Sequence, residues 1–501
     1  MGKFFGGMFV LGVIGFFIWL WGAQIFRWFS TEWRGAGPVL LGIVVVAILF
    51  TLAGYFADEG SASRGFLILF GVVGIMATIF IGVKLPWDTA RQYTADIKSV
   101  TKEVPSYEQR APYVVANASS ASNLQNSIGE RQETKSLADE GKTGQWNTLV
   151  NRAGFNVGYE SVQSIDTPLY GSAKASSIKS CVFDENAQLR FGGMFPHNDL
   201  LRAIYWQTPW NVNLSIEDAY SYCDGKTPYV VVPLKKIEGF YAPQWYAYGV
   251  ALYNGSTGEL SVLNDEESLA KIPGPIYPVS LAQTQREANI ASGENWGDYI
   301  WGTTGYENTS KDVEDPNFDN NSEFSLRNSS SEKVEFVTPL TPRGSSTAIV
   351  ALSAVEANEV KSGTRNPLVI YKFDNSEVRP ANSAVEDDIR SNYSWMPEMS
   401  SNDNKIFEIV PAENGSWVAS IGRAQAVAYR AIIEADGTIT LYNKSGNIVT
   451  QSNPGGENTD ESGTGGGSGG YDINTDLSTL TPEQLRELGK SILDELAKRS
   501  K

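Results

Sequence analysis

The fold is decided by three apolar stretches: FFGGMFVLGVIGFFIWLWG at Phe4–Gly22, PVLLGIVVVAILFTLAGYF at Pro38–Phe56 and GFLILFGVVGIMATIFIGV at Gly65–Val83. Each stretch has 19 residues and contains no acidic residue, lysine, arginine or histidine. At a rise of 1.5 Å per residue, about 20 helical residues cross a hydrocarbon layer roughly 30 Å thick. We therefore predict three transmembrane helices within residues 1–87, which anchor the rest of the chain in a lipid bilayer.

The third stretch carries small residues at every fourth position, namely Gly74, Thr78 and Gly82. Small side chains let two helices approach closely, which matters in lipid because no hydrophobic force presses helices together. These three residues are predicted helix-packing positions, either within the same bundle or against a second copy of the chain. Spans without charges argue against a pump or ion carrier, because transport pathways generally need ionisable groups inside the membrane.

The charges near the spans predict a topology. With an external N-terminus, the cytoplasmic side receives the larger set of basic residues, which comprises Arg27, Arg34, Lys84, Arg91, Lys98 and Lys102. The positive-inside rule then favours a soluble part in the cytoplasm of a cell with a bacterial-type inner membrane. The opposite orientation stays open, since several Asn-x-Ser/Thr triplets would suit an exterior surface; examples start at Asn213, Asn254, Asn308 and Asn392.

Net charge is unevenly distributed. The chain carries -17 overall, whereas residues 1–104 hold eight basic and six acidic residues, so the remainder carries -19. A soluble part this acidic repels phosphate backbones, which argues against nucleic acid as a partner. The partners we expect are the lipid bilayer and a protein, which could be a second copy of the chain.

Two cysteines, Cys181 and Cys223, and one histidine, His197, limit the chemistry. The cysteines could form one disulfide in an oxidising compartment or remain two buried thiols, and we favour the thiols. Zinc hydrolase motifs and facial triads need at least two histidines. No G-x-S-x-G motif accompanies His197, and no cysteine-hydrolase context surrounds Cys181. We therefore assign no catalytic residue, cofactor or metal ligand.

From Phe155 the sequence is typical of a mainly β domain, with some helix. Short Val-, Ile- and Tyr-rich segments alternate with turn residues. Tyr229–Pro233 and Tyr248–Tyr253 are predicted strands, and the turn Asn254–Gly258 predicts a hairpin with Glu259–Leu263. The predicted organisation follows in full: 1–87 three transmembrane helices; 88–150 juxtamembrane stalk; 151–305 first α+β domain; 306–333 loop insertion; 334–453 second β-rich domain; 454–480 flexible linker; 481–499 C-terminal docking helix.

A strand that ends in proline and is followed by a second strand recurs along the chain. After Tyr229–Pro233, the motif returns at Glu335–Pro339 with Thr347–Ser353, and at Phe407–Pro411 with Trp417–Ser420. Because proline cannot donate to a sheet ladder, it predicts a strand end or edge at each position. The three units could come from duplication, or they could be unrelated β-rich segments of similar composition.

One segment resembles a known family. Ser215–Cys223 (SIEDAYSYC) has a capping serine and Asp218 at the capping-box position, which predicts a short helix, and strands YVVVP and YGVALY follow. This order over residues 215–263 resembles PepSY and cystatin-like modules. The resemblance implies a small α+β binding or inhibitory module, often attached to a membrane outside the cytoplasm. The overall plan also resembles uncharacterised membrane-anchored proteins of phages and mobile elements.

Two candidate interaction surfaces complete the sequence. Tyr241, Trp245 and Tyr246 form an aromatic cluster that suits a protein or glycan surface, although such residues also fill β cores. In the tail, Thr481 and Pro482 begin an amphipathic helix behind a glycine-rich linker. Its apolar face is predicted to bind a partner, a second copy or the chain's own domain, and comprises Leu485, Leu488, Ile492 and Leu496.

The sequence thus favours a membrane-anchored, non-enzymatic scaffold or binding protein that presents an acidic β-rich domain and recruits a partner through its C-terminal helix. The second reading is an extracytoplasmic PepSY-like modulator of a peptidase or envelope process. A third class, a carboxylate-dependent hydrolase, would require two carboxylates in one cleft with opposed pKa shifts.

Overall fold

The structure is a computed structural model. It describes residues 2–55, 62–101, 104–122, 129–137, 145–154, 157–172, 178–195, 197–309, 324–344, 346, 348–374, 379–401, 404–423 and 426–451. The linker predicted at 454–480 and the docking helix predicted at 481–499 lie outside these residues. The same holds for the four apolar positions of that helix, namely Leu485, Leu488, Ile492 and Leu496.

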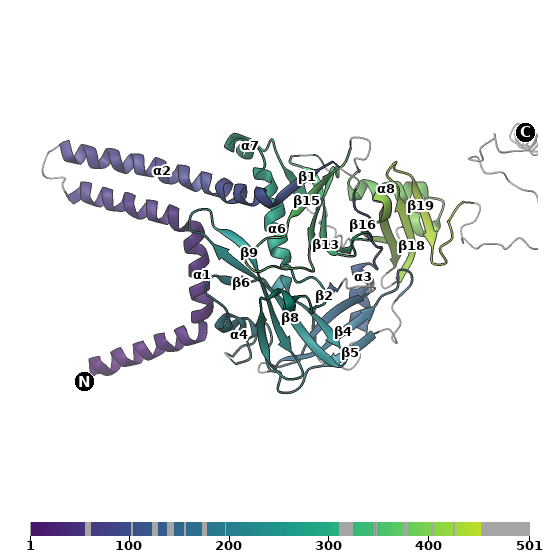
Figure 1. Cartoon of the computed structure of the whole chain (residues 1–501), viewed down its shortest axis with the longest axis horizontal. Coiled ribbons are helices and arrows are strands. Elements are labelled where there is room, and N and C mark those ends of the chain that lie inside the picture. Colours follow the sequence, from purple (N-terminus) through teal and green to yellow (C-terminus); the bar gives the residue numbers. More distant parts are fainter. Residues whose placement is uncertain are drawn as a thin grey trace, which may run out of the picture. The chain divides into compact units, whose positions relative to one another are not determined.

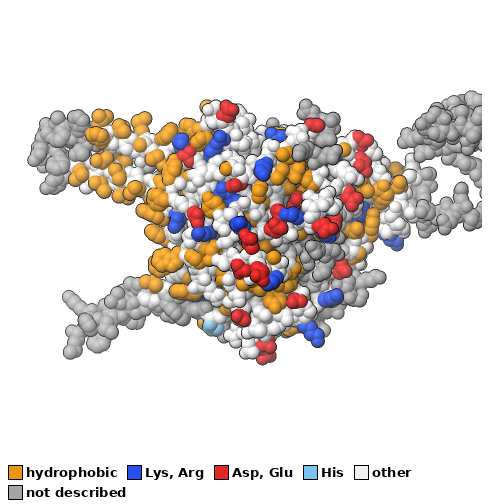
Figure 2. Space-filling model, viewed as in Figure 1, with side chains coloured by type: hydrophobic (Ala, Val, Ile, Leu, Met, Phe, Trp, Pro, Cys, Tyr) orange, Lys and Arg blue, Asp and Glu red, His pale blue; other side chains and the backbone are white. Residues whose placement is uncertain are grey.

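Two long apolar helices open the chain, α1 (Gly2–Tyr55) and α2 (Ala62–Tyr93). Within the described residues, two segments are long and apolar enough to cross a membrane, Gly22–Leu52 and Ile68–Asp96. Only 6% and 11% of their most apolar windows are buried, so they are not core helices of the β body. Figure 2 shows hydrophobic side chains covering the arm that they form. The second and third predicted spans are thus confirmed as long apolar helices.

The first predicted span falls in the early part of α1, where most side chains lie outside the described part of the structure, so it stays a prediction. The 54 residues of α1 would be about 80 Å long if straight, far more than one bilayer crossing needs. Figure 1 shows that α1 instead changes direction along its length, so that its middle lies along the body while its two ends extend away from it.

The described residues of the body form four sheets, and most strands of each sheet follow a helix in the chain; the exception is β1 of sheet 3, which precedes the helix of that sheet. Helix α3 (Tyr113–Ser122) precedes sheet 1, α4 (Leu200–Gln207) sheet 2, α6 (Val279–Glu287) sheet 3 and α8 (Asn382–Asn392) sheet 4. Sheet 1 comprises β2 (Glu130–Ser136), β3 (Gln145–Asn151), β4 (Tyr159–Asp166) and β5 (Ile178–Val182). Sheet 2 comprises β6 (Val212–Leu214), β7 (Tyr220–Asp224), β8 (Thr227–Glu238), β9 (Gln244–Asn254) and β10 (Leu260–Leu263).

Sheet 3 comprises β1 (Ile97–Val100), β11 (Tyr306–Asn308), β12 (Phe324–Arg327), β13 (Val334–Pro342), β14 (Ala351–Glu356) and β15 (Leu368–Lys372). Sheet 4 comprises β16 (Lys405–Pro411), β17 (Trp417–Arg423), β18 (Ala426–Ile433) and β19 (Ile439–Asn443). Shorter helical elements are η2 (Thr94–Asp96), η4 (Ile216–Asp218), α5 (Glu266–Leu269), η5 (Ala288–Ala291), α7 (Trp296–Trp301), α9 (Pro397–Ser400) and η7 (Glu413–Gly415).

Strand pairing is antiparallel throughout these sheets except at β1, which pairs in parallel with β15. Because β1 directly follows α2 and η2, the second apolar helix leads straight into an edge of sheet 3. The predicted hairpin is confirmed: β9 and β10 pair around the turn at Asn254, where Gly258 has a φ of +74° that other residues rarely adopt.

Neighbouring sheets share cores, because successive residues of a strand point to opposite faces. In β8, Val230 and Val232 pack toward sheet 1, whereas Val231 packs toward sheet 3. Sheets 3 and 4 share a third core, in which Val337 and Trp417 lie with the apolar face of α8. An inner strand therefore needs apolar residues at consecutive positions, which explains the continuous VVV run of β8.

Helix α3, which precedes sheet 1, also contacts sheet 4, so the first and last parts of the body touch each other. Val115 of α3 packs with Phe407 and Val427 of sheet 4. A buried ion pair lies beside them, with Arg110 Nη2 3.1 Å from Glu408 Oε1. Burial raises the pKa of the Glu408 carboxyl, and the nearby arginine guanidinium groups partly offset that rise.

Two of the three predicted proline positions differ from expectation. Pro233 and Pro339 lie inside β8 and β13, whereas Pro411 does end β16. On one side, β8 pairs with β7 up to Val231 and with β6 from Leu234, so Pro233 falls between two short partner strands. Pro339 occupies the same gap between the partners of β13, which are β12 and β11. The missing N–H therefore costs no ladder bond on that side, and sheets 2 and 3 share a pairing pattern.

The helix predicted at Ser215–Cys223 is wrong beyond its first turn. Only η4 is helical, and β7 begins at Tyr220. Tyr220 and Tyr222 both pack into the core between sheets 2 and 3, whereas Cys223 packs on the opposite face. The alternation of period two in AYSYC thus outweighs the capping pattern, and the PepSY-like segment has no helix at this place.

The favoured interpretation of the cysteines is also wrong. Cys181 of β5 and Cys223 of β7 form a disulfide, which links sheet 1 to sheet 2 across 42 residues of sequence. Cys181 is therefore not a free thiol that could act as a nucleophile with His197, whose ring stacks on Phe195.

The predicted boundaries do not coincide with the sheets. Residues 88–150 are not a stalk, because they contain η2, β1, α3 and the first two strands of sheet 1. The predicted insertion at 306–333 contains β11 and β12, which pair with β13 of the same sheet. Low apolar content misled the first prediction, since β2 is an edge strand that needs few apolar residues.

Candidate functional site at the junction of the apolar helices and the body

The small residues of α2 lie against α1. A Cβ atom on Gly74 would approach Val46 Cγ2 to 2.9 Å, and one on Gly42 would approach Thr78 Oγ1 to 2.6 Å. A Cβ atom on Gly82 would lie 3.8 Å from Val39 Cγ2. The structure thus places Gly74, Thr78 and Gly82 at a helix contact within the chain, which is the first of the two partners considered for them.

The middle of α1 presents polar side chains to the body. Gln24, Arg27, Thr31 and Arg34 recur at intervals of three or four residues and so share one helix face. Gln24 Nε2 donates to Asp199 Oδ2 at 3.3 Å, and Thr31 Oγ1 accepts from Asn213 Nδ2 at 2.8 Å. Arg34 Nη1 donates to the carbonyl oxygen of Gly239 at 2.9 Å. We call these four residues the polar stripe.

Arg27 is the centre of the polar stripe and is only 3% exposed. Its Nε donates to the Val212 carbonyl at 2.7 Å, and Nη1 to that of Tyr205 at 2.8 Å. Nη2 donates to the Thr208 carbonyl and hydroxyl oxygens at 2.6 and 2.7 Å, and to the Pro209 carbonyl at 3.0 Å. Several acceptors belong to the C-terminal end of α4, where carbonyls lack helical partners and the helix dipole favours a cation.

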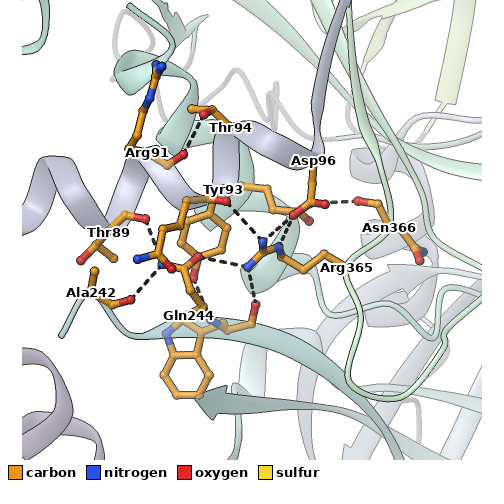
Figure 3. A network of polar contacts seen from close by, with 12 residues as sticks. Thr89, Arg91, Tyr93, Thr94, Asp96, Ala242, Gln244, Arg365 and Asn366 are labelled. Atoms are coloured by element: carbon orange, nitrogen blue, oxygen red, sulfur yellow. Dashed lines mark hydrogen bonds and ion pairs between the residues drawn. The ribbon is translucent and has the colours of Figure 1, made fainter. Parts of the chain in front are cut away.

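A second arginine fixes the end of α2 (Figure 3). Arg365 lies between the rings of Tyr93 and Tyr246, 4.6 Å from each centroid. Its Nε donates to Asp96 Oδ2 at 2.6 Å, and Nη1 donates to Gln244 Oε1 at 3.0 Å. This planar, stacked arrangement suits guanidinium and not the point charge of lysine.

Gln244 links Arg365 to α2 through a second set of hydrogen bonds. Its Nε2 donates to the carbonyl of Thr89 at 3.0 Å, while the backbone N–H of Trp245 donates to the Tyr93 hydroxyl at 2.8 Å. Figure 3 shows these groups converging on the last turns of α2 from β9 and from the segment before β15. Both apolar helices are therefore attached to the body by multiple hydrogen bonds, and not by a flexible linker.

Electrostatics at the junction follow from burial. Burial raises the pKa of the Asp199 carboxyl and lowers the pKa of the Lys235 ammonium group. Lys235 Nζ donates to Ser280 Oγ at 2.9 Å, and Ser280 Oγ donates to Asp218 Oδ2 at 2.6 Å. Asp218 also accepts from the Ser280 N–H, so this chain of bonds holds the N-terminal end of α6 against β8 and η4.

Replacing Arg365 with lysine should loosen the attachment of α2. Lysine keeps the charge but loses the two-ring stacking and the simultaneous contacts with Asp96 and Gln244, at an expected cost of about 1–2 kcal/mol. The hydrogen-exchange rate of the Trp245 amide, which donates to Tyr93, is the readout. An R423K control at an exposed position of β17 should change it little, and equal rates in both variants would contradict the assignment.

The three residues of the predicted aromatic surface differ in exposure and in their partners. Tyr241 is 46% exposed, and its hydroxyl donates a hydrogen bond to the Asp88 carboxylate. This bond raises the pKa of the Tyr241 hydroxyl. Trp245 and Tyr246 are half-buried, with Lys235 over the Trp245 ring and Arg365 over the Tyr246 ring. The cluster therefore belongs mostly to the junction.

Sequence reasoning missed Arg27 and Arg365 as site residues. Charge counting treats Arg27 only as a topology signal, although the helical spacing of the polar stripe is present in the sequence. Arg365 gave no local signal, because its partners lie more than 100 residues away. Among the described residues no group of three or more His, Cys, Asp or Glu side chains could hold a metal ion. Comparison of the chain with protein-family models, with curated proteins and with solved structures gave no match.

Proposed function

We propose that the chain is a membrane-anchored, non-enzymatic scaffold or binding protein that holds an acidic β-rich body against the bilayer and recruits a protein partner through its C-terminal helix. The observation that carries this proposal is the junction. The polar stripe on α1 and Arg365 on the body fix both helices to the body, so a partner bound to the body would have a set height and orientation above the lipid.

The anchor in this proposal has three spans. The first apolar stretch forms the early part of α1, the direction of α1 then changes along the body, and its last part pairs with α2. Three crossings place the N-terminus on the side opposite the body. Nineteen uncharged residues suffice for the first crossing.

We place the body outside the cytoplasm, in contrast to the expectation from loop charges. A disulfide between two sheets suits an oxidising compartment. Several of the basic residues counted for the opposite topology have structural partners: Arg27 and Arg34 bond to body carbonyls, and Arg91 Nη1 donates to the Ala291 and Gly293 carbonyls at 3.0 and 2.6 Å. Docking explains these charges without a cytoplasmic location.

The partner-binding part of the proposal is tested on the tail. Leu488→Asp with Ile492→Asp should remove the apolar face and abolish crosslinks to the partner in native membranes, read by mass spectrometry. Lys490→Asp with Ala497→Asp adds two acids to the opposite side of the predicted helix and should leave those crosslinks intact. An unchanged partner list and oligomer size in the first variant would overturn this role for the helix.

The second candidate is an extracytoplasmic PepSY-like modulator of a peptidase or envelope process. The disulfide fits its extracytoplasmic location, and this candidate is favoured by the order of a helix followed by an antiparallel sheet, seen for α3 with sheet 1, α4 with sheet 2 and α8 with sheet 4. Both candidates place the body outside the cytoplasm, so protease added to intact cells or spheroplasts tests that shared location and does not separate them. A peptidase among the crosslinked partners would favour the modulator.

A further inference from the structure

The middle of α1 turns its polar face toward the body and its apolar face outward, which is the opposite of a helix on the surface of a soluble protein. The polar stripe faces the protein, whereas the apolar side chains on the other side are 41–64% exposed; they are Ile25, Phe26, Trp28, Phe29 and Trp33. A helix on a water-facing surface normally turns its apolar face to the core. Here five large apolar side chains cover the outer face, so this face requires an apolar environment outside the chain.

Large exposed aromatic residues also lie on other elements. Trp206 and Trp210 flank the end of α4 and are 64% and 74% exposed, while Phe240 in the loop between β8 and β9 is 43% exposed. Trp301, at the end of α7, is 81% exposed. Isolated exposed apolar residues are common, but contiguous ones mark interaction surfaces.

Ring contacts connect these residues to the apolar helices. Trp210 stacks on Phe26 with centroids 6.1 Å apart, and Phe240 lies 6.1 Å from Trp33. On the α2 side, Trp296 of α7 meets Phe80 edge-on at 5.6 Å. Figure 2 shows hydrophobic side chains along the edge of the body from which the helices extend. We call the exposed face of residues 25–33 together with Trp206, Trp210, Phe240 and Trp301 the aromatic rim.

We propose that the aromatic rim is a lipid-binding surface that lies in the interfacial layer of the bilayer, and that the middle of α1 rests in the membrane plane and does not span it. The ligand is the headgroup and upper acyl region, where tryptophan and other aromatic rings partition favourably. This inference rests on the membrane anchoring proposed above. The continuity of the rim with helices that lead into the hydrocarbon fixes lipid as the occupant.

The geometry also explains why Arg27 is directed inward. Within residues 25–33 the basic residue, Arg27, points to the body and finds carbonyl partners there. The acidic residue, Glu32, is exposed on the outer face and would lie among the lipid headgroups. The body consequently sits directly on the lipid, and the rim and the two helices fix its tilt.

The test measures depth at single labels. Trp210→Cys and Trp301→Cys carry an environment-sensitive fluorophore in the full chain, labelled without reducing agent so that the native disulfide stays closed. Met76→Cys on α2 is the reference for hydrocarbon, and Ile448→Cys next to sheet 4 is the reference for water; the native side chains are 67% and 51% exposed. All four proteins are reconstituted in phosphatidylcholine vesicles, and only variants with the wild-type thermal midpoint are compared.

We expect lipid-borne nitroxide quenchers at a shallow acyl position to quench the labels at 210 and 301 strongly, and aqueous iodide to quench the label at 448. Quenching of the labels at 210 and 301 by iodide to the extent of 448 would overturn the proposal. Protection from both quenchers would mean that a second copy of the chain covers the rim, which also overturns it. If the lipid quenchers do not quench the label at 76 either, the proposed membrane anchoring is wrong, and the rim proposal is overturned with it.

Discussion

Arg27→Met should detach the middle of α1 from the body. The substitution removes five hydrogen bonds and leaves the carbonyl groups of Tyr205, Thr208 and Val212 without their donor, and the bonds to Thr208 and Val212 are buried. Bonds from a charged donor are worth more than neutral ones, and buried unpaired carbonyls cost about 1–3 kcal/mol each. Because α4 also loses the cation at its C-terminal end, we expect a total loss of about 3 kcal/mol or more.

The effect should be read as faster hydrogen exchange over residues 200–214 in reconstituted protein. Arg27→Lys should behave almost like Arg27→Met, since one ammonium group cannot reach acceptors that the guanidinium contacts with three nitrogens. Arg34→Met is the matched control, because it removes a single bond at a partly exposed position of the same stripe. If Arg27→Met and Arg34→Met gave the same exchange profile, Arg27 would not be the centre of the junction.

Removing the disulfide should have the second large effect. The bond closes a loop of 42 residues, for which chain entropy predicts a stabilisation of about 4 kcal/mol. Cys181→Ser with Cys223→Ser should therefore lower the thermal midpoint of the body strongly. Dithiothreitol should produce a comparable drop in the wild type and no further change in the double variant.

The same cysteines report the compartment. In intact cells, a maleimide that adds mass to free thiols should leave the wild-type chain unmodified unless a reductant is added first. Modification without reductant would mean that both thiols are free in the cell, and the proposed extracytoplasmic location of the body would then be wrong. The free-energy loss on removal of the bond in purified oxidised protein is a separate quantity and would still be measurable.

The parts of the fold that could be predicted are those with a local signal. Uncharged runs of 19 residues indicated the apolar helices, and the turn at Asn254 indicated the hairpin of β9 and β10. Local signals failed where a second sheet decides the outcome. Tyr220 and Tyr222 follow a capping pattern, yet they enter β7 because a core lies on each side of that strand.

The junction was less predictable than the fold, for two physical reasons. The arginines of α1 have two possible uses, topology and docking, and sequence alone does not separate them. Arg365 and Asp96 are 269 residues apart, and Cys181 pairs with a residue on a different sheet, so neither contact has a short-range signature. The polar stripe is the exception, because its helical spacing could have revealed a docked face.

The contact between α3 and sheet 4 has a consequence for cooperativity. In an open solenoid, terminal repeats need polar caps, and unfolding can start from either end. Here α3 and the segment before it cover sheet 4 through Val115, Phe407 and the Arg110–Glu408 pair. Neither end of the series of four sheets is therefore free to unfold first. Truncating the chain before sheet 4 should accordingly unravel sheet 1 as well, although β4 ends at Asp166 and β16 begins only at Lys405.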